Sequence, residues 1–66
     1  MNPLDTQPPP HATYPGVSVD LVLVYADGRE VPGYRCDWTG WMRTDAWVPC
    51  ECDFDPVMPV GWREKP

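Results

Sequence analysis

Residues 17–38 read VSVDLVLVYADGREVPGYRCDW, and this stretch predicts a β-hairpin. Strand-forming side chains lie on both sides of Asp27-Gly28, a pair that favours a two-residue type I′ loop. If these two residues form the loop, Ala26 lies opposite Arg29 and the other pairs follow by counting outward. One face then carries the pairs Tyr25 with Glu30, Leu23 with Pro32, Leu21 with Tyr34, Val19 with Cys36 and Val17 with Trp38. This face is almost entirely apolar, so it predicts the core and makes the tryptophan at its far end a core residue.

Asp20 lies across from Arg35 on the opposite face of this predicted hairpin. Opposite charges on directly paired strand residues attract, so the pair supports the register. A slip of one residue would move both charges onto the apolar face, where they are costly to bury. The loop sequence and the charge pair therefore favour the same alignment of the two strands.

A third strand is expected after the hairpin, because Thr39-Gly40 offers a turn into residues 41–48. This strand can pair with residues 34–38. It cannot pair beside Pro32, which has no N–H to give to a neighbouring strand. The expected fold is therefore mainly β, with a small three-stranded antiparallel meander at its centre.

Proline organises the rest of the chain, since four of its ten prolines lie within the first ten residues. Residues 1–13 are predicted to be a disordered proline-rich tail, and residues 14–66 a single small β domain. Beyond Pro49 the chain is expected to be irregular, with one short strand near residues 57–58. Its apolar side chains can lay this C-terminal segment across one face of the sheet.

The charge balance excludes several classes of partner. Ten acidic residues against five basic ones give a net charge of −5, which opposes binding to nucleic acid or to anionic membranes. The longest apolar run, residues 21–26, is far too short to cross a bilayer, and no signal-type segment is present. Three cysteines cannot all pair within one chain, which favours free thiols in a reducing compartment. We therefore expect a cytoplasmic protein that needs no cofactor.

The three cysteines also raise the question of a metal site. Cys36, Cys50 and Cys52, with His11, have the composition of a Cys3His zinc site. The spacing disfavours it, because structural zinc sites usually rest on pairs of cysteines two residues apart. Redox chemistry is disfavoured as well, since Glu51 and its acidic neighbours raise a thiol pKa. A small zinc- or redox-responsive domain therefore remains an alternative hypothesis.

The sequence contains no set of residues that could act together in catalysis. The one histidine, His11, lies in the predicted tail, and the one serine, Ser18, lies on the polar face of a strand. A nucleophile, a base and an orienting group cannot be assembled from these two. The sequence therefore predicts a protein that is not an enzyme.

Tryptophans and acids between residues 41 and 55 form the candidate binding surface. Tryptophan is enriched at interfaces, and an acidic rim around it suits a basic partner protein. The candidate binding residues are Trp41, Asp45, Trp47, Glu51, Asp53 and Asp55. Two further hypotheses stay open: a nucleic-acid mimic that inhibits a host protein, and self-association through a sheet edge.

The order of VLVYADGREVPGY, a tryptophan-bearing strand and a closing tryptophan resembles a family of short phage and prophage proteins. Its members share a C-terminal domain of unknown function and occur in lambdoid phages. Here VMPVGWREKP is similar in content to the family's closing segment, but its proline-rich part precedes Trp62. The resemblance covers at most about residues 19–66 and implies a small β-rich phage accessory protein in the bacterial cytoplasm. It transfers no catalytic residues, because the family has none assigned. The expected function is binding to a host or phage protein.

Overall fold

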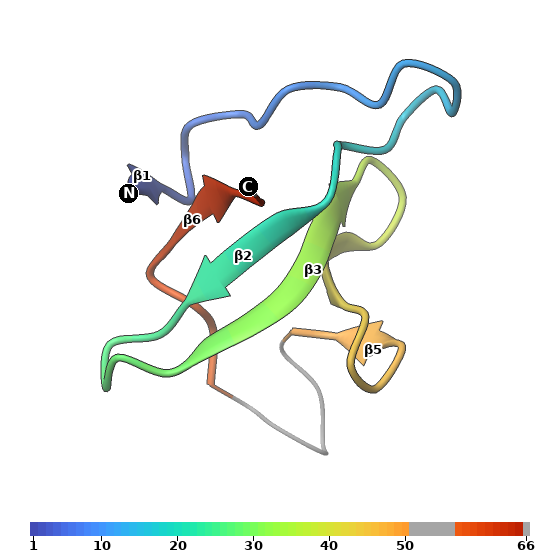
Figure 1. Cartoon of the computed structure of the whole chain (residues 1–66). Coiled ribbons are helices and arrows are strands. Elements are labelled where there is room, and N and C mark those ends of the chain that lie inside the picture. The colour runs from blue at the N-terminus through green and yellow to red at the C-terminus, as the bar shows by residue number, and fades with distance from the viewer. Residues whose placement is uncertain (51–56, 66) are drawn as a thin grey trace.

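A single antiparallel sheet of six strands organises the computed structural model, which describes residues 1–50 and 57–65 (Figure 1). The strands are β1 (Asn2–Pro3), β2 (Leu21–Val24), β3 (Glu30–Cys36), β4 (Gly40–Arg43), β5 (Val48–Pro49) and β6 (Gly61–Glu64). Their order across the sheet is β1-β6-β2-β3-β4-β5. None of the described residues is helical, so the prediction of a mainly β protein is confirmed.

The predicted sheet of three strands is too small. β2, β3 and β4 do lie side by side, but β5 extends the sheet beyond β4, while β6 and β1 extend it beyond β2. The expected long strand over residues 41–48 is instead divided, because a turn at residues 44–47 separates β4 from β5. The short strand expected near residues 57–58 is also wrong, since the C-terminal strand occupies Gly61–Glu64.

The register of the hairpin differs from the prediction by one residue. Leu23 pairs with Val31, not with Pro32, so the loop contains three residues. Gly28 adopts φ 89° at the end of this loop, and the backbone N–H of Tyr25 donates to the Arg29 carbonyl over 2.8 Å. A left-handed glycine that closes a three-residue loop creates a bulge, which is the alternative to a type I′ turn for the same Asp-Gly pair.

A second irregularity replaces the predicted pair of Asp20 with Arg35. Four residue steps separate Val17 from Leu21, but only three separate their partners Cys36 and Gly33, so the first strand contains an extra residue. Ser18 fills the gap: its hydroxyl accepts a hydrogen bond from the Arg35 backbone N–H over 2.9 Å. The guanidinium of Arg35 pairs instead with Asp37 at 3.2 Å. Neither the Asp27-Gly28 pair nor the opposite charges of Asp20 and Arg35 therefore distinguish the correct register of the hairpin.

Pro32 behaves as predicted with respect to the third strand. The ladder between β3 and β4 has the pair of Gly33 with Arg43 at its end, so it does not include Pro32, the residue directly before Gly33. The Pro32 carbonyl accepts a hydrogen bond from the Thr44 backbone N–H over 3.0 Å, so this side of Pro32 faces β4. The missing N–H therefore falls where strand pairing stops.

The disordered tail expected over residues 1–13 is not confirmed. β1 pairs with β6, and the Trp62 indole N–H donates to the Thr6 carbonyl over 2.9 Å. Farther along, His11 donates its backbone N–H to the Val17 carbonyl over 2.8 Å. The chain between β1 and β2 thus forms an irregular arm that crosses one end of the sheet (Figure 1).

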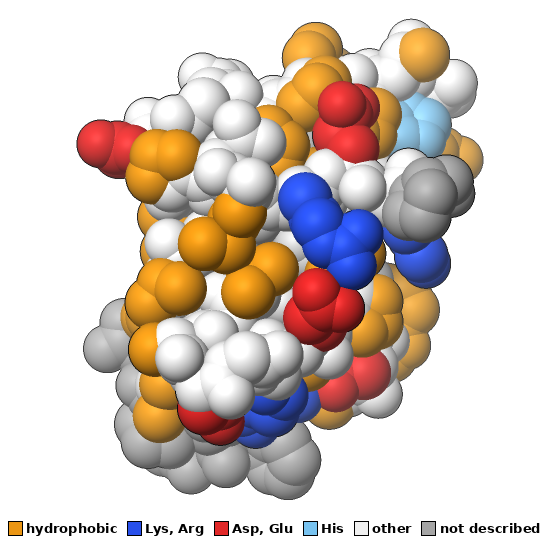
Figure 2. Space-filling view, turned by 60° about the vertical axis from the view of Figure 1, so that its left-hand side comes forward, with side chains coloured by type: hydrophobic (Ala, Val, Ile, Leu, Met, Phe, Trp, Pro, Cys, Tyr) orange, Lys and Arg blue, Asp and Glu red, His pale blue; other side chains and the backbone are white. Residues whose placement is uncertain are grey.

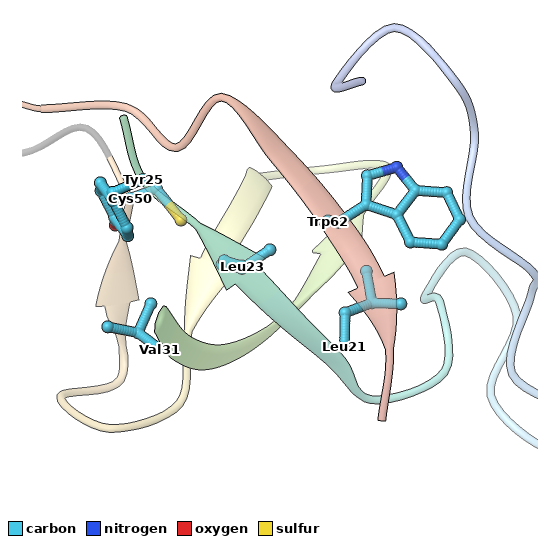
Figure 3. Close-up of a cluster of buried hydrophobic side chains, with 6 residues drawn as sticks. All are labelled: Leu21, Leu23, Tyr25, Val31, Cys50 and Trp62. Carbon is cyan, nitrogen blue, oxygen red and sulfur yellow. The ribbon is translucent and has the colours of Figure 1, made fainter. Parts of the chain in front are cut away.

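The core lies on the face of the sheet that carries Leu21 and Leu23, both 0% exposed. Figure 3 shows Trp62 and Leu21 at one end of the buried cluster, and Tyr25 with Cys50 at the other. Leu4, Val19, Trp41 and Met58 pack against this cluster from outside. The core therefore combines residues from β2, β3 and β6 with the segments that flank the sheet.

The described part of the chain contains no helix that is a candidate for crossing a membrane. No helix there reaches the length and hydrophobicity that a bilayer requires.

Candidate functional site

The four tryptophans occupy three different environments. Trp62 is buried, Trp41 is half-buried against the core, and Trp38 and Trp47 are 77% and 73% exposed. The prediction that Trp38 is a core residue is therefore wrong. The one-residue change in register and the extra residue before β2 remove the pair with Val17, and the Trp38 ring lies instead against Gly16.

Trp47 is the predicted binding residue whose exposure fits that role. It ends the turn between β4 and β5 with φ 55°, in the left-handed region that a bulky side chain adopts at an energetic cost. Burial does not compensate this cost, because most of the side chain faces solvent. Trp47 is also absent from the buried core cluster and from the residues packed against it.

The Asp45 carboxylate pairs with a neighbouring arginine, Arg43, so it is not available to an acidic binding surface. The Arg43 side chain is only 7% exposed, and its Nη2 lies 2.7 Å from an Asp45 carboxylate oxygen, while its Nε donates to the other oxygen over 3.1 Å. This bidentate pair lowers the pKa of Asp45 below its ordinary value, with the hydrogen bond from Arg43 as the main cause. The other predicted acids, Glu51, Asp53 and Asp55, lie outside the described residues.

Replacement of Asp45 by asparagine should lower the free energy of unfolding by about 2 kcal/mol, because it removes the charge that faces a buried guanidinium. The effect stays below the loss for a fully buried pair, since the Asp45 side chain is 35% exposed. Urea unfolding at pH 7 measures this difference. Because the folded pKa is lowered, the contribution is present above the ordinary Asp pKa and disappears as the pH falls through the folded value. The variant should therefore match the wild type in acid, and a difference that persists there would contradict this origin.

The two described cysteines, Cys36 and Cys50, lie in different environments. Cys50 is completely buried within the core cluster, whereas Cys36 is 8% exposed and lies outside it. No group of three potential ligands comes together among residues 1–50 and 57–65. The Trp38 backbone N–H lowers the pKa of the Cys36 thiol, and burial acts in the opposite direction. Cys52, the third predicted ligand, lies outside the described residues.

A hollow of about 300 Å³ lies beside Trp47 and was not predicted. Its aromatic lining comes from three parts of the chain: the arm before β2, strand β3, and the turn between β4 and β5. The lining includes His11, Tyr14, Tyr34, Trp47 and Asp20. The sequence predicts Tyr34 on the apolar core face and His11 in a disordered tail, so no sequence pattern indicates that the two lie together.

The arm places its two aromatic rings through local hydrogen bonds. The His11 Nδ1 accepts the backbone N–H groups of Thr13 and Tyr14 over 3.0 and 3.2 Å. The His11 and Tyr14 rings consequently lie 4.8 Å apart between centroids. The backbone bond from His11 to Val17 then fixes this turn beside the sheet. The arm therefore contributes a preformed wall of the hollow.

Comparison with protein-family models, with curated proteins and with solved structures finds no match to this chain.

Proposed function

We propose that the chain binds another protein through the exposed aromatic side chains Tyr14 and Trp47, and that it is not an enzyme. The observation that carries the proposal is Trp47, which is 73% exposed on a backbone conformation unfavourable for its side chain. Tryptophan and tyrosine supply much of the binding energy of protein interfaces because they bury large, rigid surfaces. In a domain of 66 residues, where core area is scarce, their exposure has a cost for folding.

A basic partner suits this surface best. The chain has a net charge of −5, which attracts a positively charged protein and repels nucleic acid. The resemblance to short phage proteins supports the narrower proposal of a phage accessory protein in the bacterial cytoplasm, with a host or phage protein as partner.

The alternative hypotheses have less support. A nucleic-acid mimic needs a continuous acidic face, but acidic and basic side chains lie next to each other on the face that Figure 2 shows. Acidic side chains are also neutralised within the sheet, where Arg63 pairs with Glu30 at 3.1 Å. Self-association through a sheet edge is disfavoured because the edge strands β1 and β5 have two residues each, and each contains a proline.

Replacement of Trp47 by glycine tests the proposal with little effect on folding. Glycine adopts the left-handed conformation without strain, so the free energy of unfolding should change by less than about 1 kcal/mol. Binding to a partner captured from host lysate should weaken by about 30-fold, the effect of removing an interface hot spot. Calorimetric titration of the captured partner measures this change.

Val60→Ala is the matched control, because Val60 is also exposed but does not line the hollow beside Trp47. It should bind like the wild type. Recovery of no partner at micromolar concentration, or equal binding by Trp47→Gly and the wild type, would overturn the proposal.

A further inference from the structure

The hollow beside Trp47 has the composition of a cation-binding site. Tyr14, Tyr34 and Trp47 give it aromatic walls, whose π faces attract positive charge. Asp20 adds a carboxylate, and the described lining contains neither lysine nor arginine. A cation that enters the hollow therefore meets attractive groups and no fixed positive side chain.

His11 holds the aromatic wall of the arm in place. Its Nδ1 accepts the backbone N–H groups of Thr13 and Tyr14, and its ring lies 4.8 Å from the Tyr14 ring between centroids. This arrangement is set by the arm itself, so the hollow needs little reorganisation before it binds.

The aromatic lining of the hollow favours one kind of cation. The hollow is shallow and largely open, with a volume of about 300 Å³, so a flat group of several atoms can lie across its aromatic side chains. A guanidinium group is planar, is more weakly hydrated than an ammonium group and stacks on aromatic faces. The same geometry occurs within this chain, where the guanidinium carbon of Arg29 lies 4.3 Å from the centroid of the Tyr25 ring.

We propose that this hollow receives an arginine side chain of the partner protein, with its guanidinium against the aromatic walls and its charge facing Asp20. This inference rests on the proposed function and names the group that the surface recognises. It also gives the acidic character of the chain a local role at Asp20. The acidic residues predicted beyond Cys50 are not required.

The test uses two small probes of nearly equal shape, acetyl-arginine methylamide and its neutral isostere acetyl-citrulline methylamide. Each is titrated into the full chain and followed by NMR at the Tyr14 and Tyr34 ring signals. The arginine probe should bind about tenfold more tightly, because only it adds the cation–π and carboxylate attractions. Equal affinities for the two probes would overturn the inference.

Two leucine variants locate the site. Trp47→Leu keeps an apolar side chain but removes the π face, so the preference for arginine should fall to about twofold or less. Trp38→Leu changes a tryptophan of similar exposure that does not line the hollow, and it should keep the preference. A preference that survives Trp47→Leu, or that is lost equally in Trp38→Leu, would show that the hollow is not the site.

These outcomes separate the inference from the proposed function. If Trp47→Gly loses the captured partner while the arginine and citrulline probes bind alike, protein binding stands and the arginine site falls. If the arginine preference is found and depends on Trp47, but no partner is captured, the site stands as a guanidinium site and the broader proposal falls.

Discussion

Replacement of Gly33 by alanine is expected to unfold the chain. A Cβ atom at this position would lie 2.2 Å from the Met42 carbonyl oxygen and 2.5 Å from Leu23 Cδ1. The oxygen belongs to the backbone of β4, so it moves only if the ladder between β3 and β4 opens. Leu23 is completely buried and cannot turn away into solvent. Relief of this overlap should cost more than about 4 kcal/mol, which approaches the whole stability expected for a domain of this size.

Far-UV circular dichroism and urea unfolding measure this effect, and Gly28→Ala is the matched control. Gly28 has φ 89°, but a Cβ there would meet no atom within 4 Å. Its replacement introduces only the cost of a left-handed conformation, about 1 to 2 kcal/mol. If Gly33→Ala is no less stable than Gly28→Ala, β3 and β4 are farther apart than the structure places them.

The hairpin shows what local sequence can and cannot predict. The alternation of Leu21, Leu23 and Tyr25 correctly identified the core face of β2, because each of these residues is buried. The partner strand was assigned to the wrong face, since an Asp-Gly pair fits both a two-residue loop and a three-residue loop with a bulge. The difference is decided by packing: in the observed register Gly33, not Tyr34, shares the core face with Leu23. The close approach of Leu23 to Gly33 is a tertiary fact that the loop residues do not encode.

The C-terminal strand was missed for a different reason. β6 has only four residues, follows two prolines in quick succession and pairs with β2, from which it is distant in sequence. Its pairing is non-local and depends on β2 having a free edge. The ordered start of the arm was missed for the same reason, because β1 pairs with β6, a strand at the other end of the sequence.

The candidate site was predicted in part. Trp47 was chosen because tryptophan beside acids suits an interface, and the structure exposes it. Asp45 was chosen for the same reason, but a buried arginine two residues away binds its carboxylate. The hollow required the arm to be ordered, and its proline content indicated the opposite. Tyr14 stands directly before Pro15-Gly16, a turn signal that could have placed its ring near the start of the first strand.

Trp62 should show the second large effect on stability, because it joins the arm to the sheet. Its side chain is 3% exposed, and it belongs to the core cluster together with residues of β2 and β3. Trp62→Ala should lower the free energy of unfolding by about 3 to 5 kcal/mol, the cost of a large cavity in a core. Urea unfolding followed by circular dichroism measures the loss.

Trp62→Phe separates the role of the indole N–H from that of the ring area. Phenylalanine keeps an aromatic ring in the core but cannot donate to the Thr6 carbonyl, so the sheet should persist with a loss of about 1 to 2 kcal/mol. The arm should respond more strongly than the sheet, because this bond anchors its first half. Hydrogen exchange should therefore accelerate at the Thr6 N–H, which donates to the Pro3 carbonyl, and stay slow at Leu23. Equal acceleration at both sites would mean that the arm and the sheet unfold as one unit. Because Tyr14 lies on the same arm, such coupling would also make the shape of the hollow depend on Trp62.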